Sequence, residues 1–460
     1  MEKERESLSS RLGFILLSAG CAIGLGNVWR FPAITGKYGG GAFVLIYLLF
    51  LLILGTPIMV MEFAIGRASK QNIAGALKTL EPKGTKWHYY GHLAILGNYI
   101  LMMFYTTISG WLFSYMFHTA TGDFTKLNTE QIGSYFTNML SNPGSQIFWM
   151  IITVVLALGI VAGGLENSVE KVTKIMMSLL IGLMVILAIH SITLEGGSVG
   201  LKFYLAPNFS NFTKYGFGET VFAAMGQAFF TLSIGIGSMA IFGSYIDKKH
   251  TLTGESLRII GLDTFVAIVS GLIIFPACFA FNIDPGAGPG LLFVTLPNIF
   301  NQMGGGRIWG TLFFVFMSFA ALSTLIAVFE NIVSYWIDIW KVDRKKAAII
   351  NIFVIIVLSL PCILGFNVWS DFQPLGAGTG VLDLEDFFVS TTLLPLGSLI
   401  FLLFCCNKRY GWGFKNFLKE ADIGEGVKFP KWSRIYVSYI LPLIVLFIFI
   451  QGYYNTFSKI

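Results

Sequence analysis

Long apolar segments alternate with short polar ones along almost the whole chain. Each apolar segment has about 20 residues, the length of helix that crosses the hydrocarbon core of a bilayer. Eleven such segments can be placed, at residues 12–36, 41–66, 90–119, 147–164, 168–191, 217–246, 257–282, 308–340, 346–366, 386–406 and 434–455. The pattern predicts an all-α polytopic membrane protein with eleven transmembrane helices, and this odd number places the two termini on opposite sides.

Two of these segments interrupt their own helical pattern near mid-span. The first, Arg11–Pro32, is broken by glycines between Gly20 and Gly26, and the sixth is broken at Gly235 and Gly237. Glycine carries a large entropic cost of remaining helical, although glycines in membrane helices also allow close packing. In lipid, unwound backbone is tolerated only where it is buried in protein or lines a cavity. Each break is therefore a candidate binding site.

The spacing of the two breaks indicates an internal repeat. They lie five spans apart, and interrupted helices at corresponding places in two halves are typical of inverted-repeat transporters. The sequence therefore predicts one transporter domain over residues 1–460, built as a five-plus-five inverted repeat. The first repeat would cover 12–191, the second 217–406, and an additional helix 434–455.

The ends of broken helices have a defined chemistry. A half-helix N-terminus presents unpaired N–H groups and a positive potential, which suit a carboxylate. Unwound carbonyls suit an ammonium group and hard cations such as sodium. Two breaks that meet at one site therefore predict an amino acid or a similar substrate, bound together with a cation.

Composition and charge support a membrane location. Hydrophobic residues make up 55% of the chain and charged residues 12%, against about 25% charged in soluble domains. The net charge of +6 does not indicate nucleic-acid binding, because in a membrane protein the position of Lys and Arg is what matters. With the N-terminus inside, 24 of the 31 Lys and Arg are cytoplasmic and the others are Arg30, Lys37, Lys126, Lys202, Lys214, Arg307 and Lys459. We therefore expect a cytoplasmic N-terminus and an external C-terminus.

The connecting segments carry weaker signals. Residues 120–146 and 192–215 are predicted to be polar external connections, and residues 68–88 and 407–433 to be solvated cytoplasmic faces. The external stretch 283–307 is rich in Gly and Pro and holds a short apolar piece, Gly290–Ile299. A lid that dips toward the pore and an ordinary amphipathic loop are both open interpretations of that stretch.

Three motifs give the chain a specific resemblance. They are the first broken segment with Gly39–Phe43, the sixth-span run Gly226–Gly235 and the eighth-span run Ala320–Thr324. Together they resemble the neurotransmitter:sodium symporter family nearly end to end, and its eleven-span bacterial amino-acid transporters most closely. The resemblance implies a sodium-coupled symporter that imports a hydrophobic or aromatic L-amino acid across the bacterial inner membrane by alternating access. It implies two Na+ sites and no organic cofactor, with membrane lipid but no nucleic acid as a partner. It leaves the oligomeric state open, and a dimer is one possibility.

The resemblance also assigns ligands to the two sodium sites. One site would use the carbonyl of Ala22, the side chains of Asn27, Thr231 and Asp263, and the substrate carboxylate. The other would use the carbonyls of Gly20, Ile23 and Ala320 and the hydroxyls of Ser323 and Thr324. A substrate oxygen shared with an ion couples the two, because each raises the affinity of the other.

Asp263 departs from the pattern of the family, which usually has an amide at this position, and many of whose members bind chloride next to it. A buried acid in a membrane span is costly unless it is paired, and it is functional by default. We hypothesise that Asp263 supplies the fixed negative charge, so that transport needs no chloride. Ala267, one turn later, carries no charge.

The implied substrate pocket is almost wholly apolar. Tyr105 would hydrogen-bond the substrate carboxylate, and Phe230 would form an aromatic lid above it. The full lining would be Cys21, Ala22, Leu25, Gly26, Leu101, Tyr105, Phe230, Thr231, Ser233, Ile236, Thr324 and Val328. No acid or base is free for a charged substrate side chain, which favours hydrophobic or aromatic amino acids. Ile236 stands where related transporters of aliphatic amino acids carry a larger aromatic residue, so the space could admit an aromatic substrate.

Charged pairs match the two gates of the family. Arg30 and Asp386 would close the outer side, although Asp386 could simply cap a helix. The inner gate would comprise Arg5, Asp338, Tyr245 and Glu330. Leu8 stands at the position of a family tryptophan, which predicts different packing at the inner gate.

Other classes of protein remain open from the sequence. An uncoupled amino-acid sensor or channel could retain this fold, but the intact set of ion ligands argues against lost coupling. The same fold could move an osmolyte or another small amine. An enzyme finds little support, because the chain has no nucleotide-binding loop and no HExxH motif, and its five His are scattered.

Overall fold

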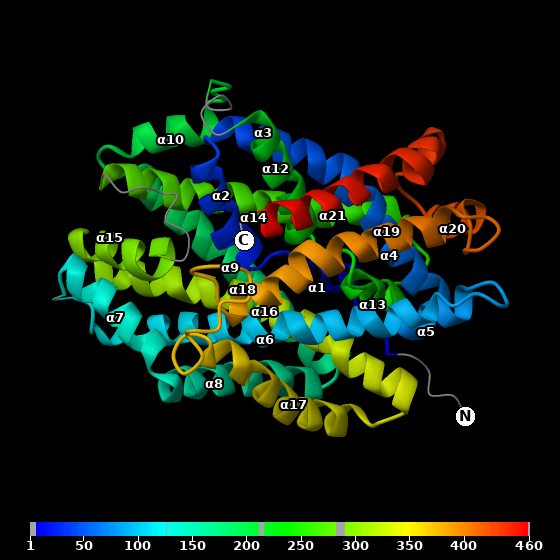
Figure 1. Ribbon diagram of the computed structural model, residues 1–460, viewed down its shortest axis with the longest axis horizontal. Coiled ribbons are helices and arrows are strands. Elements are labelled where there is room, and N and C mark those ends of the chain that lie inside the picture. The colour runs from blue at the N-terminus through cyan, green and yellow to red at the C-terminus, as the bar shows by residue number, and fades with distance from the viewer. Residues whose placement is uncertain (1–5, 126, 211–215, 282–289, 459–460) are drawn as a thin grey trace.

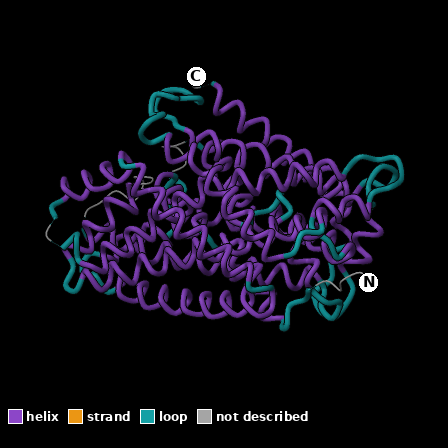
Figure 2. Tube along the Cα trace, turned by 90° about the horizontal axis from the view of Figure 1, so that it is seen from below, coloured by secondary structure: helices purple, strands orange, loops and turns teal. Residues whose placement is uncertain are grey.

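The computed structural model describes residues 6–125, 127–210, 216–281 and 290–458. Within these ranges the chain forms helices and connecting loops, with one isolated β-bridge between His250 and Glu425. Most helices run along the long axis of the molecule, and the loops gather at its two ends (Figure 1 and Figure 2). The prediction of an all-α membrane protein is confirmed.

Nine helical segments of the described ranges are long and apolar enough to cross a membrane. Six of them contain one helix of the chain each: α6 (His88–Thr121), α8 (Pro143–Ala162), α9 (Lys171–Ile192), α14 (Leu252–Ala280), α16 (Gly306–Trp340) and α17 (Arg344–Leu364). The others contain α3 (Gly41–Phe50) with α4 (Thr56–Ser69), α18 (Val381–Asp386) with α19 (Leu394–Cys406), and α21 (Leu441–Phe457). A tenth is the pair Arg11–Ala22 (α1) and Gly26–Lys37, which ends in α2 (Phe31–Lys37) and is bent by 54°.

The sixth predicted span is present as two separate helices, α12 (Phe217–Thr231) and α13 (Ser238–Tyr245). Both predicted breaks are therefore confirmed, whereas the total of eleven membrane crossings stays a prediction. Prolines help to shape several spans: α4, α19 and α21 each have a proline in the first turn, and a π-helical turn comes directly before each of them. Proline has no N–H to bond to the preceding turn, which favours such local irregularity.

Two groups of helices pack as blocks. α6 packs most extensively against α16, and α8 and α17 pack against both of them. α13 packs instead against α4, which also contacts α14. α1 contacts α16 and α9 on one side and α14 and α13 on the other. The first broken helix therefore lies at the boundary between the blocks, near the middle of the molecule (Figure 1).

Each of the four polar stretches contains a short helix that the sequence analysis did not predict. These helices are α5 (Ile73–Leu80), α7 (Thr129–Ser141), α10 (Gly197–Leu205) and α20 (Phe414–Ala421). Each is amphipathic and lays its apolar side on the ends of the spans, as Phe417 and Ala421 of α20 show by being fully buried. Helices this short are stabilised by packing rather than by propensity, so the pattern of the isolated stretch does not reveal them.

The stretch 283–307 is also more ordered than a loop. Residues 282–289 lie outside the described residues, and the remainder forms a π-helical turn, Leu291–Thr295, followed by α15 (Leu296–Gln302). The turn packs against α7 and α15 packs against α16, with Leu291, Leu292 and Phe293 fully buried. The apolar piece is thus packed against neighbouring helices.

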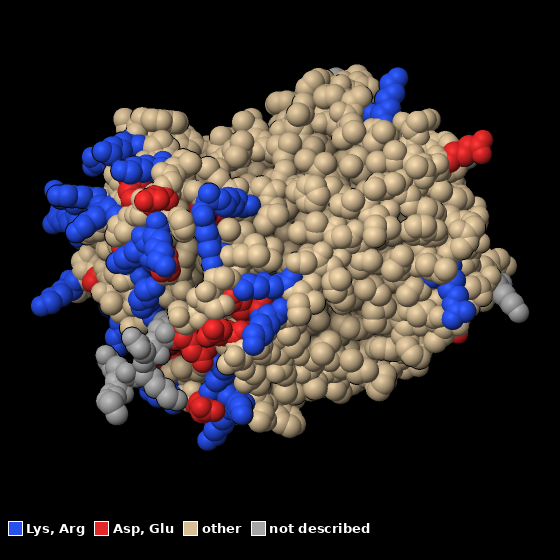
Figure 3. Space-filling model, turned by 180° about the vertical axis from the view of Figure 1, so that it is seen from behind, with Lys and Arg blue, Asp and Glu red and all other residues tan. Residues whose placement is uncertain are grey.

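Charged side chains mark one end of the helices. On the face shown in Figure 3, Lys and Arg gather mostly at the end that holds α5, α13 and α20, with a few at the opposite end. At this end, Arg67 of α4 has no exposed side-chain surface and pairs with Glu420 of α20 at 2.7 Å. Its Nη1 also donates to the carbonyl of His250 at 2.9 Å. The basic stretch 407–433 is therefore tied to the ends of the spans by a buried ion pair.

Candidate functional site

The first break begins where α1 ends at Ala22. Ile23 has an extended conformation (φ −73°, ψ 96°), and the helix resumes with a π-helical turn at Gly26–Arg30. A Cβ added at Gly24 would lie 2.4 Å from the hydroxyls of both Tyr105 and Thr324. The backbone of the break therefore touches these two side chains directly, and only glycine allows that approach.

The second break spans the six residues between α12 and α13. Three of them, Ser233, Gly235 and Gly237, have positive φ values of 50°, 103° and 74°, so the chain turns here in a way that few side chains permit. The hydroxyl of Tyr90 donates to the carbonyl of Gly235 at 2.6 Å, and the carboxylate of Glu62 accepts the N–H of the same residue. The freed backbone groups are thus bound by side chains from α6 and α4.

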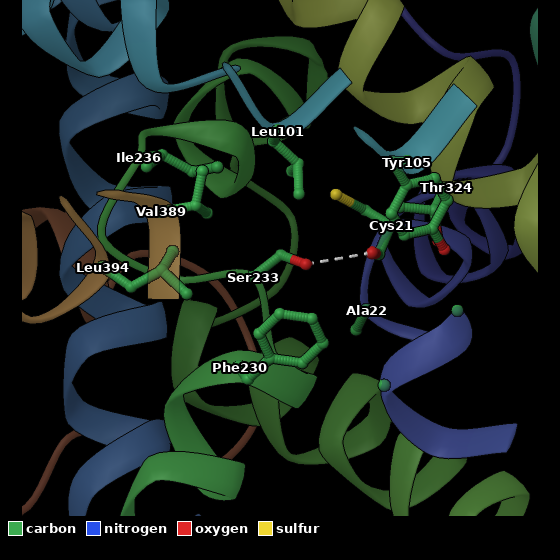
Figure 4. Close-up of a pocket in the computed structure, with 12 residues that line it drawn as sticks. Cys21, Ala22, Leu101, Tyr105, Phe230, Ser233, Ile236, Thr324, Val389 and Leu394 are labelled. Carbon is green, nitrogen blue, oxygen red and sulfur yellow. Dashed lines mark hydrogen bonds between the residues drawn. The ribbon is translucent and has the colours of Figure 1, made fainter. Parts of the chain in front are cut away.

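The two breaks meet. The hydroxyl of Ser233 donates to the carbonyl of Cys21 at 3.2 Å, and Figure 4 shows it pointing across the site toward Cys21. The amide Nε2 of Gln227 donates to the carbonyl of Gly26 at 2.9 Å. Polar side chains of the sixth span therefore bind backbone carbonyls on either side of the first break.

A cavity lies at this meeting point (Figure 4). Nine of the residues predicted for the substrate pocket line it: Cys21, Ala22, Gly26, Leu101, Tyr105, Phe230, Ser233, Ile236 and Thr324. Gly24, Val389 and Leu394 also line it and were missed by the sequence analysis. Val389 and Leu394 belong to the tenth span, where an apolar run gave no reason to single them out.

Three residues predicted for the pocket do not line the cavity: Leu25, Thr231 and Val328. Leu25 instead donates its backbone N–H to the Tyr105 hydroxyl at 3.1 Å. Thr231 faces Asp263, and Val328 is fully buried in α16. Thr231 thus belongs to a neighbouring polar cluster.

The cavity is small and mostly apolar. It leaves about 20 Å³ for the centre of a water molecule, which is room for about one water. Its polar groups are hydroxyls, one thiol and unwound backbone, and none of its lining residues is charged. A substrate larger than water must therefore press the lining side chains outward, and it would meet no charged partner for its own side chain.

Asn27, Thr231 and Asp263 form one cluster beside the cavity, all three fully buried. Asn27 Nδ2 donates to Asp263 Oδ1 at 2.8 Å, and Thr231 Oγ1 lies 3.3 Å from Asp263 Oδ2. Asn27 Oδ1 accepts the N–H of Gly24 at 3.3 Å, which ties the cluster to the first break. Ala22, predicted for the same ion site, lines the adjacent cavity. The cluster offers several oxygen atoms and one carboxylate, a donor set that suits a hard cation.

All five residues predicted for the second ion site are also brought together. Ser323 Oγ lies 2.8 Å from the carbonyl of Ala320 and 3.2 Å from that of Ile23. Thr324 Oγ1 lies 3.2 Å from the carbonyl of Gly20 and 3.3 Å from that of Ile23. Five oxygen atoms from α1 and α16 thus face one another at the first break, and sodium prefers such ligands.

The two residues predicted for the outer gate are connected indirectly. Arg30 Nη1 lies 3.5 Å from Ser390 Oγ, and Ser390 donates to Asp386 at 2.6 Å. The Arg30 guanidinium also lies 4.2 Å from the centre of the Phe230 ring. Ser390 thus bridges the predicted pair, and the cation rests on the aromatic residue that lines the cavity.

The residues predicted for the inner gate contact a basic residue that the sequence analysis missed. Tyr245 donates to Glu330 at 2.6 Å, as the predicted grouping requires. Glu330 is fully buried and forms a 2.6 Å ion pair with Arg344 of α17, which also pairs with Glu6. Asp338 accepts the backbone N–H of Asn72 at the start of α5, and Arg5 lies outside the described residues. Arg344 belongs to a run of three basic residues, 344–346, and the sequence gave no sign that it reaches a buried carboxylate.

Two interrupted membrane helices that meet at an apolar cavity flanked by clusters of oxygen atoms define a secondary transporter. The chain belongs to the sodium:neurotransmitter symporter family, whose model matches residues 5–134 and 119–459. It is therefore a sodium-dependent membrane transporter of a small molecule rather than an enzyme.

Relatives of this chain occur in bacteria, archaea and mammals. It is 33% identical to the uncharacterized sodium-dependent transporter YhdH of Bacillus subtilis (strain 168), over 98% of both chains. It is 31% identical to the uncharacterized sodium-dependent transporter MJ1319 of Methanocaldococcus jannaschii, over 96% of this chain and 89% of the relative. It is 26% identical to the sodium- and chloride-dependent taurine transporter of Rattus norvegicus, over 89% of this chain and 72% of the relative.

A solved structure has the same fold. The crystal structure of MhsT in complex with L-phenylalanine superposes with a TM-score of 0.87 at 37% sequence identity, over 98% of this chain and all of that chain. The family and the arrangement of the helices are therefore common to both proteins.

Proposed function

We propose that the protein is a symporter that uses sodium to import a hydrophobic or aromatic L-amino acid by alternating access. The observation that carries this proposal is the uncharged, mostly apolar cavity where the two helix breaks meet. Unwound backbone at Gly24–Gly26 would bind the amino acid's carboxylate together with the Tyr105 hydroxyl. The remaining walls would hold an apolar side chain, a class to which the phenylalanine bound by MhsT also belongs.

Two sodium ions would travel with the substrate. The cluster of Asn27, Thr231 and Asp263 would bind one ion, completed by the Ala22 carbonyl and the substrate carboxylate. The five oxygen atoms between α1 and α16 would bind the other and hold the first break against α16. Ion and substrate would stabilise the same closed arrangement of the two blocks, which is a physical basis for coupling.

Asp263 would make this transport independent of chloride. Two sodium ions bring a charge of +2 and a zwitterion brings none, so a fixed carboxylate offsets part of the excess. The hydrogen bonds described for Asp263 come from the neutral groups of Asn27 and Thr231, which leaves its charge available to an ion. The taurine transporter named above, by contrast, is chloride-dependent.

The membrane arrangement is part of the same proposal. The end that carries most Lys and Arg (Figure 3) would face the cytoplasm of a bacterial cell, with the N-terminus inside and the C-terminus outside. Residues 12–191 and 217–406 would form the two inverted repeats. Helices of both repeats would contribute to the block that moves.

Uptake into proteoliposomes tests the proposal. An inward sodium gradient should drive accumulation of labelled leucine or phenylalanine, and apolar amino acids should compete better than glutamate, lysine, taurine or GABA. Replacing chloride by gluconate should leave the rate unchanged. If uptake does not depend on the sodium gradient, the protein is not a sodium symporter. If taurine or GABA competes best, the proposed substrate class is wrong. If uptake is lost in gluconate, Asp263 does not replace chloride.

A further inference from the structure

Asn98 is a fully buried amide on α6, directly beside the second break. Its Nδ2 donates to the carbonyl of Ala94 on its own helix at 2.8 Å and to the carbonyl of Ile236 at 2.9 Å. Its Oδ1 accepts from the Ser238 hydroxyl at 3.1 Å and from Asn331 Nδ2 at 3.2 Å. An asparagine side chain has two N–H donors and an acceptor oxygen with two lone pairs, so every position is used.

These bonds join helices of the two blocks beside the cavity. Ile236 lies in the second break and Ser238 is the first residue of α13. α13 packs mainly against α4, whereas α6 packs mainly against α16. Asn331 lies on α16, so one amide connects α6, α16 and the broken helix. Ile236 also lines the cavity, so the residue whose carbonyl Asn98 binds has its side chain in the site.

The other end of α13 is fastened to the same block. The hydroxyl of Tyr245 bonds to Glu330 and Ser334 of α16 at 2.6 and 2.7 Å. Asn331, which bonds to Asn98, follows Glu330 in the sequence. The start of α13 is therefore bonded to Asn98 of α6, which in turn bonds to Asn331 of α16. The end of α13 bonds directly to Glu330 and Ser334 of α16, at the predicted inner gate.

We propose that Asn98 is a positioning residue that links the cavity to the closure of the inner gate. This rests on the alternating access of the proposed function, in which α13 must leave the block of α6 and α16 before the cytoplasmic side opens. A ligand against Ile236 fixes the peptide that Asn98 binds, and that peptide sets the position of the start of α13. Opening of the inner gate then requires the hydrogen bonds at both ends of α13 to break. The bonds that Asn98 makes at the cavity therefore contribute to the stability of the closed gate.

Hydrogen exchange on the purified protein in sodium, without substrate, tests this link. Asn98→Leu keeps the volume and removes the four bonds; the amides of residues 237–245 should exchange about tenfold faster, because exchange reports local opening. The matched control is Asn351→Leu. Asn351 is equally buried; it accepts a hydrogen bond from the Tyr99 hydroxyl at 2.6 Å and donates one to a carbonyl of its own helix, α17. Because Asn351 joins α6 to α17 inside one block, its replacement should leave the exchange of residues 237–245 unchanged.

Sodium titration of uptake supplies the functional readout. Asn98→Leu should raise the half-saturating sodium concentration about tenfold, because the apparent sodium affinity falls in proportion to the population of the closed state. Asn351→Leu should leave this concentration unchanged.

Two outcomes would overturn the proposal: unchanged exchange at residues 237–245 in Asn98→Leu, or the same acceleration in both variants. If Asn98→Leu does not fold, Ser238→Ala and Asn331→Leu each remove one of the bonds to Asn98 and should accelerate exchange of the same amides a few-fold. If neither variant accelerates it, the proposal is overturned. The exchange measurement needs no substrate. If the unaltered protein shows no amino-acid uptake, the proposed function is refuted, but the exchange result for Asn98→Leu still holds.

Discussion

Replacing Asp263 by Asn tests the electrostatic centre of the site. The substitution keeps the shape and an oxygen atom and removes one negative charge. Asp263 oxygens lie 2.8 Å from Asn27 Nδ2 and 3.3 Å from Thr231 Oγ1, so an ion held by these residues would lie no more than about 4 Å from the carboxylate. At that distance two unit charges interact by about 4 kcal/mol at an effective dielectric constant of about 20. That energy corresponds to about a thousandfold change in ion affinity.

The assay is the sodium dependence of uptake in proteoliposomes, with folding checked by size-exclusion chromatography. The matched control is Glu62→Gln, which also removes one fully buried carboxylate but leaves an oxygen to accept the N–H of Gly235. We expect a rise of two to three orders of magnitude in half-saturating sodium for Asp263→Asn and a few-fold change at most for the control. Equal, small changes in both variants would show that the charge of Asp263 does not act on the ion.

Three further substitutions test other parts of the structure. Gly24→Ala puts a Cβ 2.4 Å from the hydroxyl of Tyr105 and should abolish sodium-dependent uptake, whereas Gly159→Ala, whose Cβ meets nothing within 4 Å, should retain it. Tyr105→Phe removes the hydroxyl that binds the unwound backbone and should raise the KM for amino acid about tenfold, worth about 1.4 kcal/mol; an unchanged KM would contradict that role. Arg67→Met leaves the carboxylate of Glu420 buried without its main partner and should destabilise the fold by about 3 kcal/mol, seen as a lower Tm in detergent, with part of the loss recovered in the double variant Arg67→Met/Glu420→Met.

The broken helices could be predicted from the sequence because their signal is local. Glycines at Gly20–Gly26 and Gly235–Gly237 interrupt runs that are otherwise apolar and helical. Unpaired backbone groups cost free energy in lipid, so an interrupted helix there indicates a binding site or a cavity. The five oxygen atoms between α1 and α16 were assigned through the resemblance, and the structure brings all five together.

The side chains that support the second break could not be predicted, because their partners are backbone groups. Tyr90 and Asn98 donate to carbonyls of Gly235 and Ile236, which lie more than a hundred positions away. A sequence shows the polar side chain in an apolar run but not the carbonyl that it reaches. Ser390 was missed for a similar reason, since a bridge between two charged residues is a property of their spacing in three dimensions.

In the proposed symporter, the contact between Arg30 and Phe230 would set an upper limit on the size of the transported molecule. The Phe230 ring lines the cavity, and the Arg30 guanidinium lies over that ring at 4.2 Å. A molecule too bulky to fit beneath the ring would push it outward and move Arg30 away from Ser390 and Asp386. Such a molecule could occupy the site from outside and yet hold the external entrance open. The same stacking that closes the entrance over a cargo of the right size would therefore turn an oversized analogue into a blocker that is bound but never carried.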